Sequence, residues 1–236
     1  MRLHMTATAL GALLFALPGF AGSAPKSEPE GFALPAGCEA FLTVQNKSCS
    51  VMLMWQCEGA AEGKSWAANF SDYGLESISA YSPEYQWLDT VYTWDQSREQ
   101  FTPPAADPID MTELMKTGRD QYDFIMHRSL PDLSYDIHVT GSDHLTGEVE
   151  TIDGQRLEKV AIQMTITAED GTVEYQSAGT QYFSHELKQF FLGIEDVTDA
   201  EGRTEQYDDS PVDFILPGEP GFGATSPLYG CGGGAA

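Results

Sequence analysis

The histidines are the first candidates for catalysis or metal binding, because the pKa of imidazole lies nearest to neutral pH. Beyond residue 24 the chain has four of them, His127, His138, His144 and His185. His138 and His144 flank a turn expected at Gly141. The register of that turn would place the two side chains on opposite faces of a sheet. We therefore expect exposed or hydrogen-bonded strand histidines rather than a metal site or a catalytic pair.

The motifs of the common catalytic sites are missing. The sequence has no G-x-S-x-G nucleophile elbow and no P-loop. His185 and Glu186 begin an H-E-x-x-H zinc motif, but Gln189 stands where the second histidine should be. We predict no catalytic residue, no metal ion and no cofactor, and a protein that is not an enzyme. A hydrolase without a known motif remains the alternative.

Acidic side chains are too numerous for any one pair of them to be informative. The chain has 36 Asp and Glu against 12 Lys and Arg, a formal net charge of -24. Such a charge repels phosphate groups, so we expect neither nucleic-acid binding nor direct binding to an anionic membrane. One dense group has the oxygen ligands that calcium prefers, but its spacing differs from that of an EF-hand, and we expect a solvated acidic loop. This group comprises Asp196, Asp199, Glu201, Asp208, Asp209 and Asp213.

The aromatic residues are more informative about binding. Several lie between residues 81 and 94, a segment with the composition of a strand. If the sheet curves into a barrel, an apolar cavity would be lined by Trp55, Trp87, Phe124 and Tyr175. We expect these side chains to contact a ligand. The alternative is that they fill the core.

Four cysteines, Cys38, Cys49, Cys57 and Cys231, predict two disulfides in an exported chain. If residues 49–57 form one strand, its ends lie roughly 26 Å apart, too far for a bond between Cys49 and Cys57. A hairpin turning near residues 46–48 places Cys38 opposite Cys57 and leaves Cys49 for Cys231. A thiolate metal site is the alternative, but the C-x-x-C spacing is absent.

Residues 145–183 carry the clearest structural signal. They predict three antiparallel strands, residues 145–152, 155–168 and 172–183, joined by Asp153-Gly154 and Asp170-Gly171, which are typical hairpin turns. The registers place Ile166 opposite Tyr175, Ala168 opposite Val173 and Ile162 opposite Leu145. They also pair Lys159 with Glu148 and put Val149 on the apolar face.

Other segments predict further short strands and one helix. Asp110 and Gly118 predict the start and end of a helix over residues 111–117. Residues 184–192 fit either a second short helix or a tight turn and a strand. Strands are expected at residues 38–57 as a hairpin, 64–72, 75–81, 85–94, 98–102 before Pro103 and Pro104, 121–128, 133–139 before a turn at 141–143, and 212–216 as an edge strand.

The ends of the chain predict export. Residues 1–24 have the basic start, apolar segment and small residues of a cleaved signal peptide, so we expect a periplasmic or extracellular protein. A membrane-spanning helix is the alternative, but glycines and a proline interrupt the segment. We further predict a flexible leader at 25–37, one antiparallel β domain at 38–216, and a Gly/Pro-rich tail at 217–236 tethered by a disulfide.

Together these features predict a mainly β protein, a single antiparallel meander of about ten strands in a curved sheet, a barrel or half-barrel, with one or two short helices. In architecture it is similar to lipocalin-like barrels and periplasmic lipid carriers. We expect a non-enzymatic domain that binds an apolar or amphipathic ligand, such as a hydrophobic small molecule, or an envelope component such as an envelope protein. The alternative is a structural or protein-interaction module of the envelope.

Overall fold

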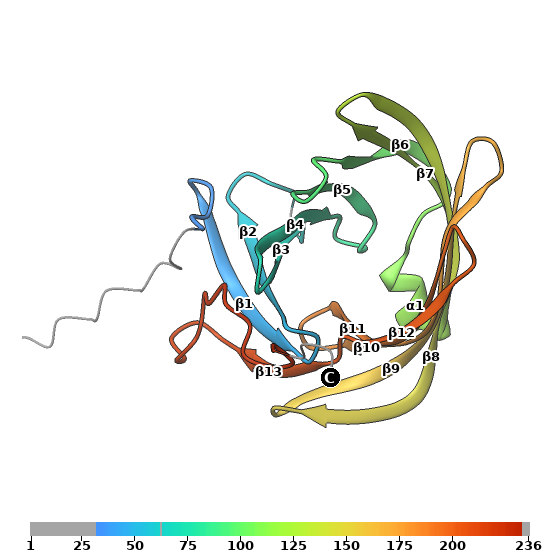
Figure 1. Ribbon diagram of the computed structural model, residues 1–236. Helices are drawn as coiled ribbons and strands as arrows, with labels where there is room; N and C mark the ends of the chain where they lie inside the picture. The colour runs from blue at the N-terminus through green and yellow to red at the C-terminus, as the bar shows by residue number, and fades with distance from the viewer. Residues whose placement is uncertain (1–31, 62, 233–236) are drawn as a thin grey trace, which may run out of the picture.

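The computed structural model describes residues 32–61 and 63–232, so the predicted signal peptide and most of the leader lie outside the described residues. The described residues form one antiparallel sheet of 13 strands, in the order β12-β11-β10-β9-β8-β7-β6-β5-β4-β3-β2-β1-β13, which curves strongly around an interior (Figure 1). The elements are β1 (Cys38–Asn46), β2 (Ser50–Cys57), β3 (Ser65–Ser71), β4 (Gly74–Tyr81), β5 (Trp87–Tyr92), β6 (Arg98–Asp107), α1 (Met111–Thr117), β7 (Arg119–Leu130), β8 (Leu133–Ile152), β9 (Gln155–Ala168), β10 (Val173–Ser184), β11 (Gln189–Asp199), β12 (Thr204–Asp208) and β13 (Pro211–Ile215).

The sheet does not close into a barrel. Its two edge strands, β12 and β13, follow each other in the chain, β12 paired with β11 and β13 with β1. The long β8–β9 hairpin reaches the free edge of β13, where the Asp153 carboxylate accepts a 2.8 Å hydrogen bond from the Phe214 backbone N–H. The gap between the two sheet edges is therefore bridged by the Asp153 side chain and by the short connection from β12 to β13. No ladder of backbone hydrogen bonds closes it.

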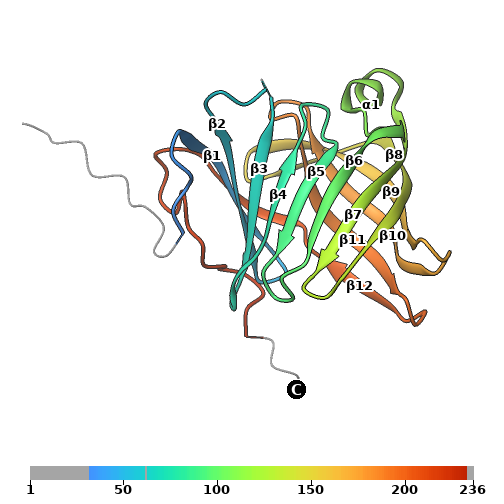
Figure 2. The same ribbon diagram turned by 90° about the horizontal axis from the view of Figure 1, so that it is seen from above.

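The interior of the curve is filled with side chains. One apolar cluster contains Phe124, Met126, Ile137 and Val139, and α1 adds Met111 and Leu114 to a second with Phe183 and Phe190. The helix has the predicted bounds: the Asp110 side chain caps its start and Gly118, at a φ of 78°, ends it. It lies near one end of the sheet (Figure 2).

At the other end of the interior a group of charged residues is partly buried. The guanidinium of Arg128 contacts the carboxylates of Glu99, at 2.6 Å, and Glu174, and its Nη1 donates to the Tyr135 hydroxyl at 3.3 Å. Only 19% of the Arg128 side chain and 10% of the Glu99 side chain are exposed. Because a buried charge is costly without a partner, these residues depend on each other.

The two Asp-Gly turns are confirmed, but the registers beside them are partly wrong. Tyr175 lies opposite Ile166 as predicted, whereas Val173 lies opposite Thr167 because of a bulge. A second bulge, at Gly147 with a φ of 80°, shifts β8 so that Leu145 faces Val160 and not Ile162, and leaves Val149 exposed. The predicted ion pair survives, with Lys159 Nζ 3.5 Å from Glu148.

Both predicted disulfides are present, Cys38–Cys57 and Cys49–Cys231. The predicted register of the first hairpin holds only at its start, because a bulge after Ala40 shifts the ladder by one residue. Leu42 and Val44 therefore face the interior. Val51, Leu53 and Trp55 instead pack on the opposite face with Phe32 and Phe70. Apolar side chains are thus buried on both faces of this hairpin. A register that places all of them on one face does not predict this.

Three other predictions need correction, and one alternative left open above is decided. No turn occurs at residues 141–143, since β8 runs unbroken through them. The strand at Arg98 continues past Pro103 and Pro104 to Asp107, because the prolines bulge out of the ladder with β7 instead of ending it. The stretch expected as an acidic loop after Glu195 is largely the β11–β12 hairpin, and residues 184–192 adopt the turn and strand. The strands expected at residues 133–139 and 145–152 are one strand, β8, whereas β12 and most of β11 lie where no strand was predicted, so the sheet has 13 strands rather than about ten.

Candidate binding groove on the outer face of the sheet

The four aromatic residues predicted to bind a ligand do not lie together. Trp87, Phe124 and Tyr175 pack in one interior cluster, with the Trp87 and Phe124 rings edge to face at 5.9 Å. Trp55 is on the opposite face of its strand, 2% exposed, with its ring 5.9 Å from Phe32. The cavity that Trp87 borders measures about 50 Å³, close to the volume of one or two water molecules.

That interior cavity has a polar side formed by Asp143 and Gln181. Asp143 of β8 borders it together with Gln181, whose Nε2 donates to Glu195 at 2.8 Å. Burial raises the pKa of Asp143 to about 7, and the nearby Asp120 and Glu195 carboxylates add to the shift. Burial also raises the pKa of Asp120 to about 6, although it accepts a 3.1 Å hydrogen bond from the backbone N–H of Asp110.

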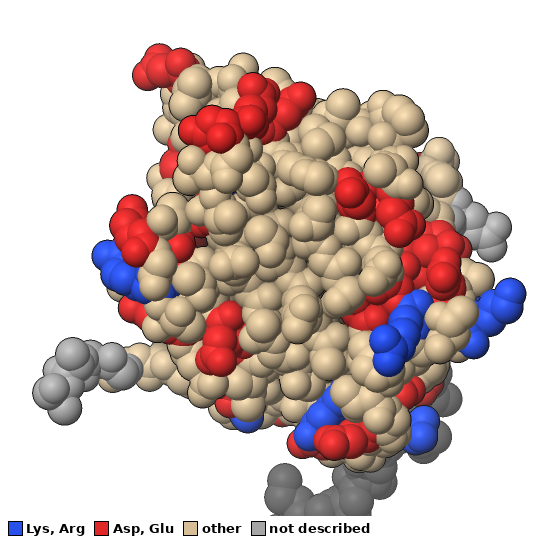
Figure 3. Space-filling view, turned by 90° about the vertical axis from the view of Figure 1, so that its right-hand side faces the viewer, with Lys and Arg blue, Asp and Glu red and all other residues tan. Residues whose placement is uncertain are grey.

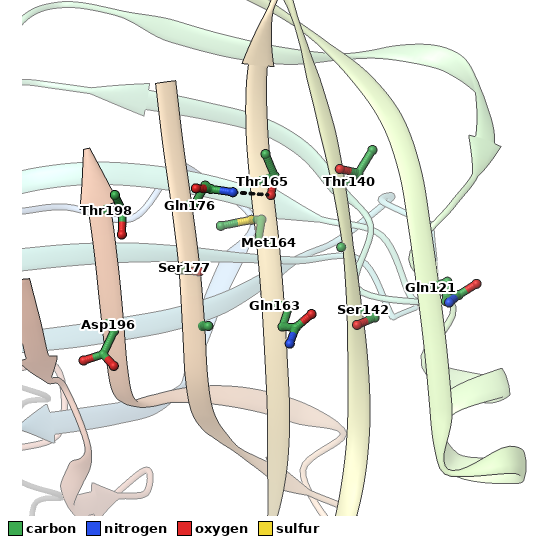
Figure 4. Close-up of a pocket in the computed structure, with 12 residues that line it drawn as sticks. Gln121, Thr140, Ser142, Gln163, Met164, Thr165, Gln176, Ser177, Asp196 and Thr198 are labelled. Carbon is green, nitrogen blue, oxygen red and sulfur yellow. Dashed lines mark hydrogen bonds between the residues drawn. The ribbon is translucent and has the colours of Figure 1, made fainter. Parts of the chain in front are cut away.

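A larger hollow lies on the outer face of the sheet, across β7 to β11. Its volume is about 460 Å³, within the range of ligand sites in proteins. Outward side chains of five neighbouring strands, Gln121 among them, project onto this surface (Figure 4). Two of the lining residues point the other way: Met164 packs against the interior cluster and Ser177 is buried. The residues that line this outer groove are Gln121, Thr140, Gly141, Ser142, Gln163, Met164, Thr165, Gln176, Ser177, Ala178, Asp196 and Thr198.

Strand alternation places the polar members of this set on the same face. On β9, Gln163 and Thr165 point outward, while Ile162 and Ile166 on either side of them are in the core and Met164 between them packs against it. Glycine at position 141 allows a close approach on the inner side, because the Tyr122 ring lies where a Cβ would otherwise stand. The groove is thus built on strands whose other face is fixed by the core.

Much of the hydrogen-bonding capacity of the outer groove is free. Gln176 Nε2 donates to Thr165 Oγ1 at 3.4 Å, and Asp196 accepts from Gln206 at 2.9 Å. Four other side chains make no hydrogen bond to any residue that the structure describes: Gln121, Thr140, Ser142 and Gln163. These amides and hydroxyls can both donate and accept, so the groove suits a ligand rich in hydroxyl or amide groups.

The outer groove is also nearly free of charge in a strongly acidic chain. Asp196 is the one ionisable residue among those that line it. The molecule seen from the side of β7 and β8 shows a broad uncharged area, with acidic and basic side chains towards its margins (Figure 3). The groove therefore favours neutral ligands over ions.

The histidines lie on the outer surface and do not form a joint site. His127 contacts Asp136 and His138 contacts Asp123, both at 2.7 Å, while His185 contacts Glu158. His138 and His144 share a face of β8, contrary to the prediction, because the turn expected between them is strand. In residues 32–61 and 63–232 no group of three or more His, Cys, Asp or Glu has the arrangement of a metal site.

Sequence reasoning missed the outer groove. A signal was present in the outward positions of three consecutive strands, which carry Thr140, Ser142, Gln163, Thr165 and Gln176 where charged residues dominate elsewhere.

Within the part of the chain that the structure describes, no helix is long and apolar enough to span a bilayer. Comparison of the chain with models of protein families, with characterised proteins and with solved structures finds no match.

Proposed function

We propose that the protein is an exported, non-enzymatic binding module whose outer groove holds an uncharged envelope component rich in hydroxyl groups, such as a neutral glycan chain. The observation that carries this proposal is the row of amide and hydroxyl side chains on β7 to β11, several of them without an internal partner. Disulfides and the N-terminal segment favour an oxidising compartment outside the cytoplasm, the periplasm or the cell exterior.

The shape of the groove supports a chain-like ligand. It is shallow and crosses several strands, so an extended neutral chain can contact side chains of β7, β8 and β9 at once. Since the sheet fixes the backbone of these strands, ligand binding orders only the side chains and not the strands that carry them. The groove offers neither a lysine nor an arginine for anion recognition.

The proposal is tested by binding of neutral oligosaccharides built from glucose, galactose or mannose, with uronic-acid oligosaccharides as charged counterparts. Replacing Gln121 and Gln163 by alanine removes two free amides, each worth about 0.5–1.5 kcal/mol when hydrogen-bonded, so we expect a loss of roughly 5- to 150-fold in affinity. Gln100→Ala is the matched control, because Gln100 is an exposed glutamine of β6 outside the groove. Equal loss in the control, or preference for the charged sugars, would contradict the proposal.

An apolar or amphipathic ligand near Trp87, Phe124 and Tyr175 is the second candidate, supported by their shared cluster. It requires the interior to open beyond the present cavity of about 50 Å³. Native mass spectrometry of the gently extracted protein separates the candidates. A co-purified lipid supports the interior ligand, whereas a stably bound protein supports an interaction module of the envelope.

A further inference from the structure

Large apolar side chains are exposed at one end of the sheet, on the hairpin turns opposite α1. Alternate turns of an antiparallel meander fall at the same end, and those of β3–β4, β5–β6 and β7–β8 project together there (Figure 2). Four successive turns of this end carry or adjoin such a residue: Tyr73 is 92% exposed, Trp94 72%, Leu133 59% and Val173 40%. We call these four residues the apolar rim.

The two aromatic residues of the apolar rim lie on turns that are held together. The backbone N–H of Thr93 donates to the carbonyl of Glu76 at 2.9 Å, which joins the β5–β6 turn to the start of β4. Tyr73 precedes β4 directly and Trp94 follows Thr93. The two most exposed large apolar side chains of the described residues therefore occur on neighbouring turns.

Turn geometry does not explain the apolar rim. The turns are made by other residues: the Asp95 carboxylate accepts from the Ser97 N–H, the Asp170 carboxylate from the Thr172 N–H, and Gly74 and Gly171 have positive φ. At the opposite end, the described connections between strands expose no large apolar side chain, and Val149, 43% exposed, lies within β8. The difference between the two ends indicates a contact surface.

The charged residues beside the apolar rim indicate which kind of partner surface the rim can contact. The connections of these four hairpins, residues 72–73, 93–97, 131–132 and 169–172, contain no Lys or Arg. They contain the carboxylates of Asp72, Asp95, Asp132, Glu169 and Asp170. Carboxylates and aromatic rings attract an ammonium group and repel a bare phosphate, and Trp and Tyr favour the boundary between lipid and water.

We propose that the apolar rim docks on a zwitterionic lipid surface, with Trp94 and Tyr73 entering the headgroup layer and the neighbouring carboxylates facing its ammonium groups. This contact is independent of the outer groove. The groove lies on the side of β7 to β11, whereas the rim lies at the turns, so a surface-docked molecule leaves the groove accessible. Docking through the turns of one end needs no basic residue and no helix.

The test is co-sedimentation of the disulfide-bonded protein from residue 25 onwards with vesicles of phosphatidylcholine and phosphatidylethanolamine. We expect binding to these vesicles, and weaker binding when phosphatidylglycerol is added. Trp94→Ala should lower the partition coefficient about tenfold and Trp94→Ala with Tyr73→Ala further still. Leu192→Ala is the matched control, since Leu192 is 49% exposed on β11 away from the turns, and should bind as the parent does.

No binding to the zwitterionic vesicles would overturn the proposal. So would unchanged binding of the double variant, or stronger binding to vesicles with phosphatidylglycerol. Sedimentation velocity without lipid adds a separate check. Self-association that Trp94→Ala abolishes would assign the rim to contact between copies of the chain and would also overturn the proposal. Thermal unfolding of each variant should match the parent, because the replaced side chains are exposed.

Discussion

Asparagine in place of Asp143 should stabilise the protein at neutral and alkaline pH. Asp143 is a partly buried carboxyl on the wall of the small interior cavity, and its pKa is raised from 3.8 to about 7 by burial and by Asp120 and Glu195. Each tenfold difference in proton affinity is worth about 1.4 kcal/mol, so the ionised form is disfavoured in the fold by about 4 kcal/mol. Because water reaches part of the side chain, we expect a gain of about 2 kcal/mol from Asp143→Asn near pH 8.

The sign of the pH dependence follows from the direction of the shift. A raised carboxyl pKa means that the folded state binds more protons than the unfolded state between about pH 4 and pH 7. The stability contributed by Asp143 is therefore complete below its unfolded pKa and is lost as the pH rises through about 7. Asp120, with a pKa of about 6, acts in the same direction.

Urea unfolding at about pH 5 and about pH 8, followed by tryptophan fluorescence with the disulfides intact, measures this effect. The free energy of unfolding of the parent should be lower at about pH 8 than at about pH 5. For Asp143→Asn this decrease should be smaller. Asp132→Asn is the control, because Asp132 is exposed in the β7–β8 turn. The reasoning is refuted if Asp143→Asn gives the same gain at both pH values, or if it destabilises the protein near pH 8.

Two further changes test the packing around the sheet. Replacing Cys49 and Cys231 by serine opens a loop of 182 residues and should cost about 5 kcal/mol in the chain-entropy model, seen as a lower urea midpoint; a cost below about 1 kcal/mol would show that the tail is held mainly by its other contacts. Arg128→Met leaves the partly buried Glu99 and Glu174 carboxylates without their cation. This change should lower the free energy of unfolding by about 3–5 kcal/mol in the same assay. An unchanged urea midpoint would mean that water compensates the two charges.

The elements that sequence reasoning predicted best are those with local signals. Asp110 and Gly118 mark the helix ends because capping and a left-handed residue are decided within a few residues. Asp153-Gly154 and Asp170-Gly171 mark hairpins for the same reason. Both disulfides followed from strand length, which is again a local property.

The errors arose where pairing depends on bulges or on the other face of a strand. The bulge at Gly147 moves the partner of Leu145 from Ile162 to Val160, and nothing in the alternation of β8 fixes its position. Gly141 looked like a turn residue, yet it is strand because the Tyr122 ring needs the space of its missing side chain. At Gly141, local propensity gave way to packing.

The outer groove and the interior carboxylates were beyond sequence reasoning for a related reason. The groove exists because the registers of β7 to β11 bring Gln121, Ser142 and Gln163 to the same level of the sheet. Aspartate side chains are usually exposed, so the sequence alone places Asp143 and Asp120 at the surface. In the fold both are partly buried on the inner side of the sheet. Both features depend on contacts between strands.

The most direct test of the proposed function is a map of the bound ligand on the protein. Side-chain amide signals of Gln121, Gln163 and Gln176 can be followed by NMR while a neutral oligosaccharide is added, with Gln100 as the reference outside the groove. We expect saturable shifts in the three groove glutamines and none in Gln100. Shifts confined to residues around Trp87 and Phe124, or no shift with any neutral sugar, would contradict it.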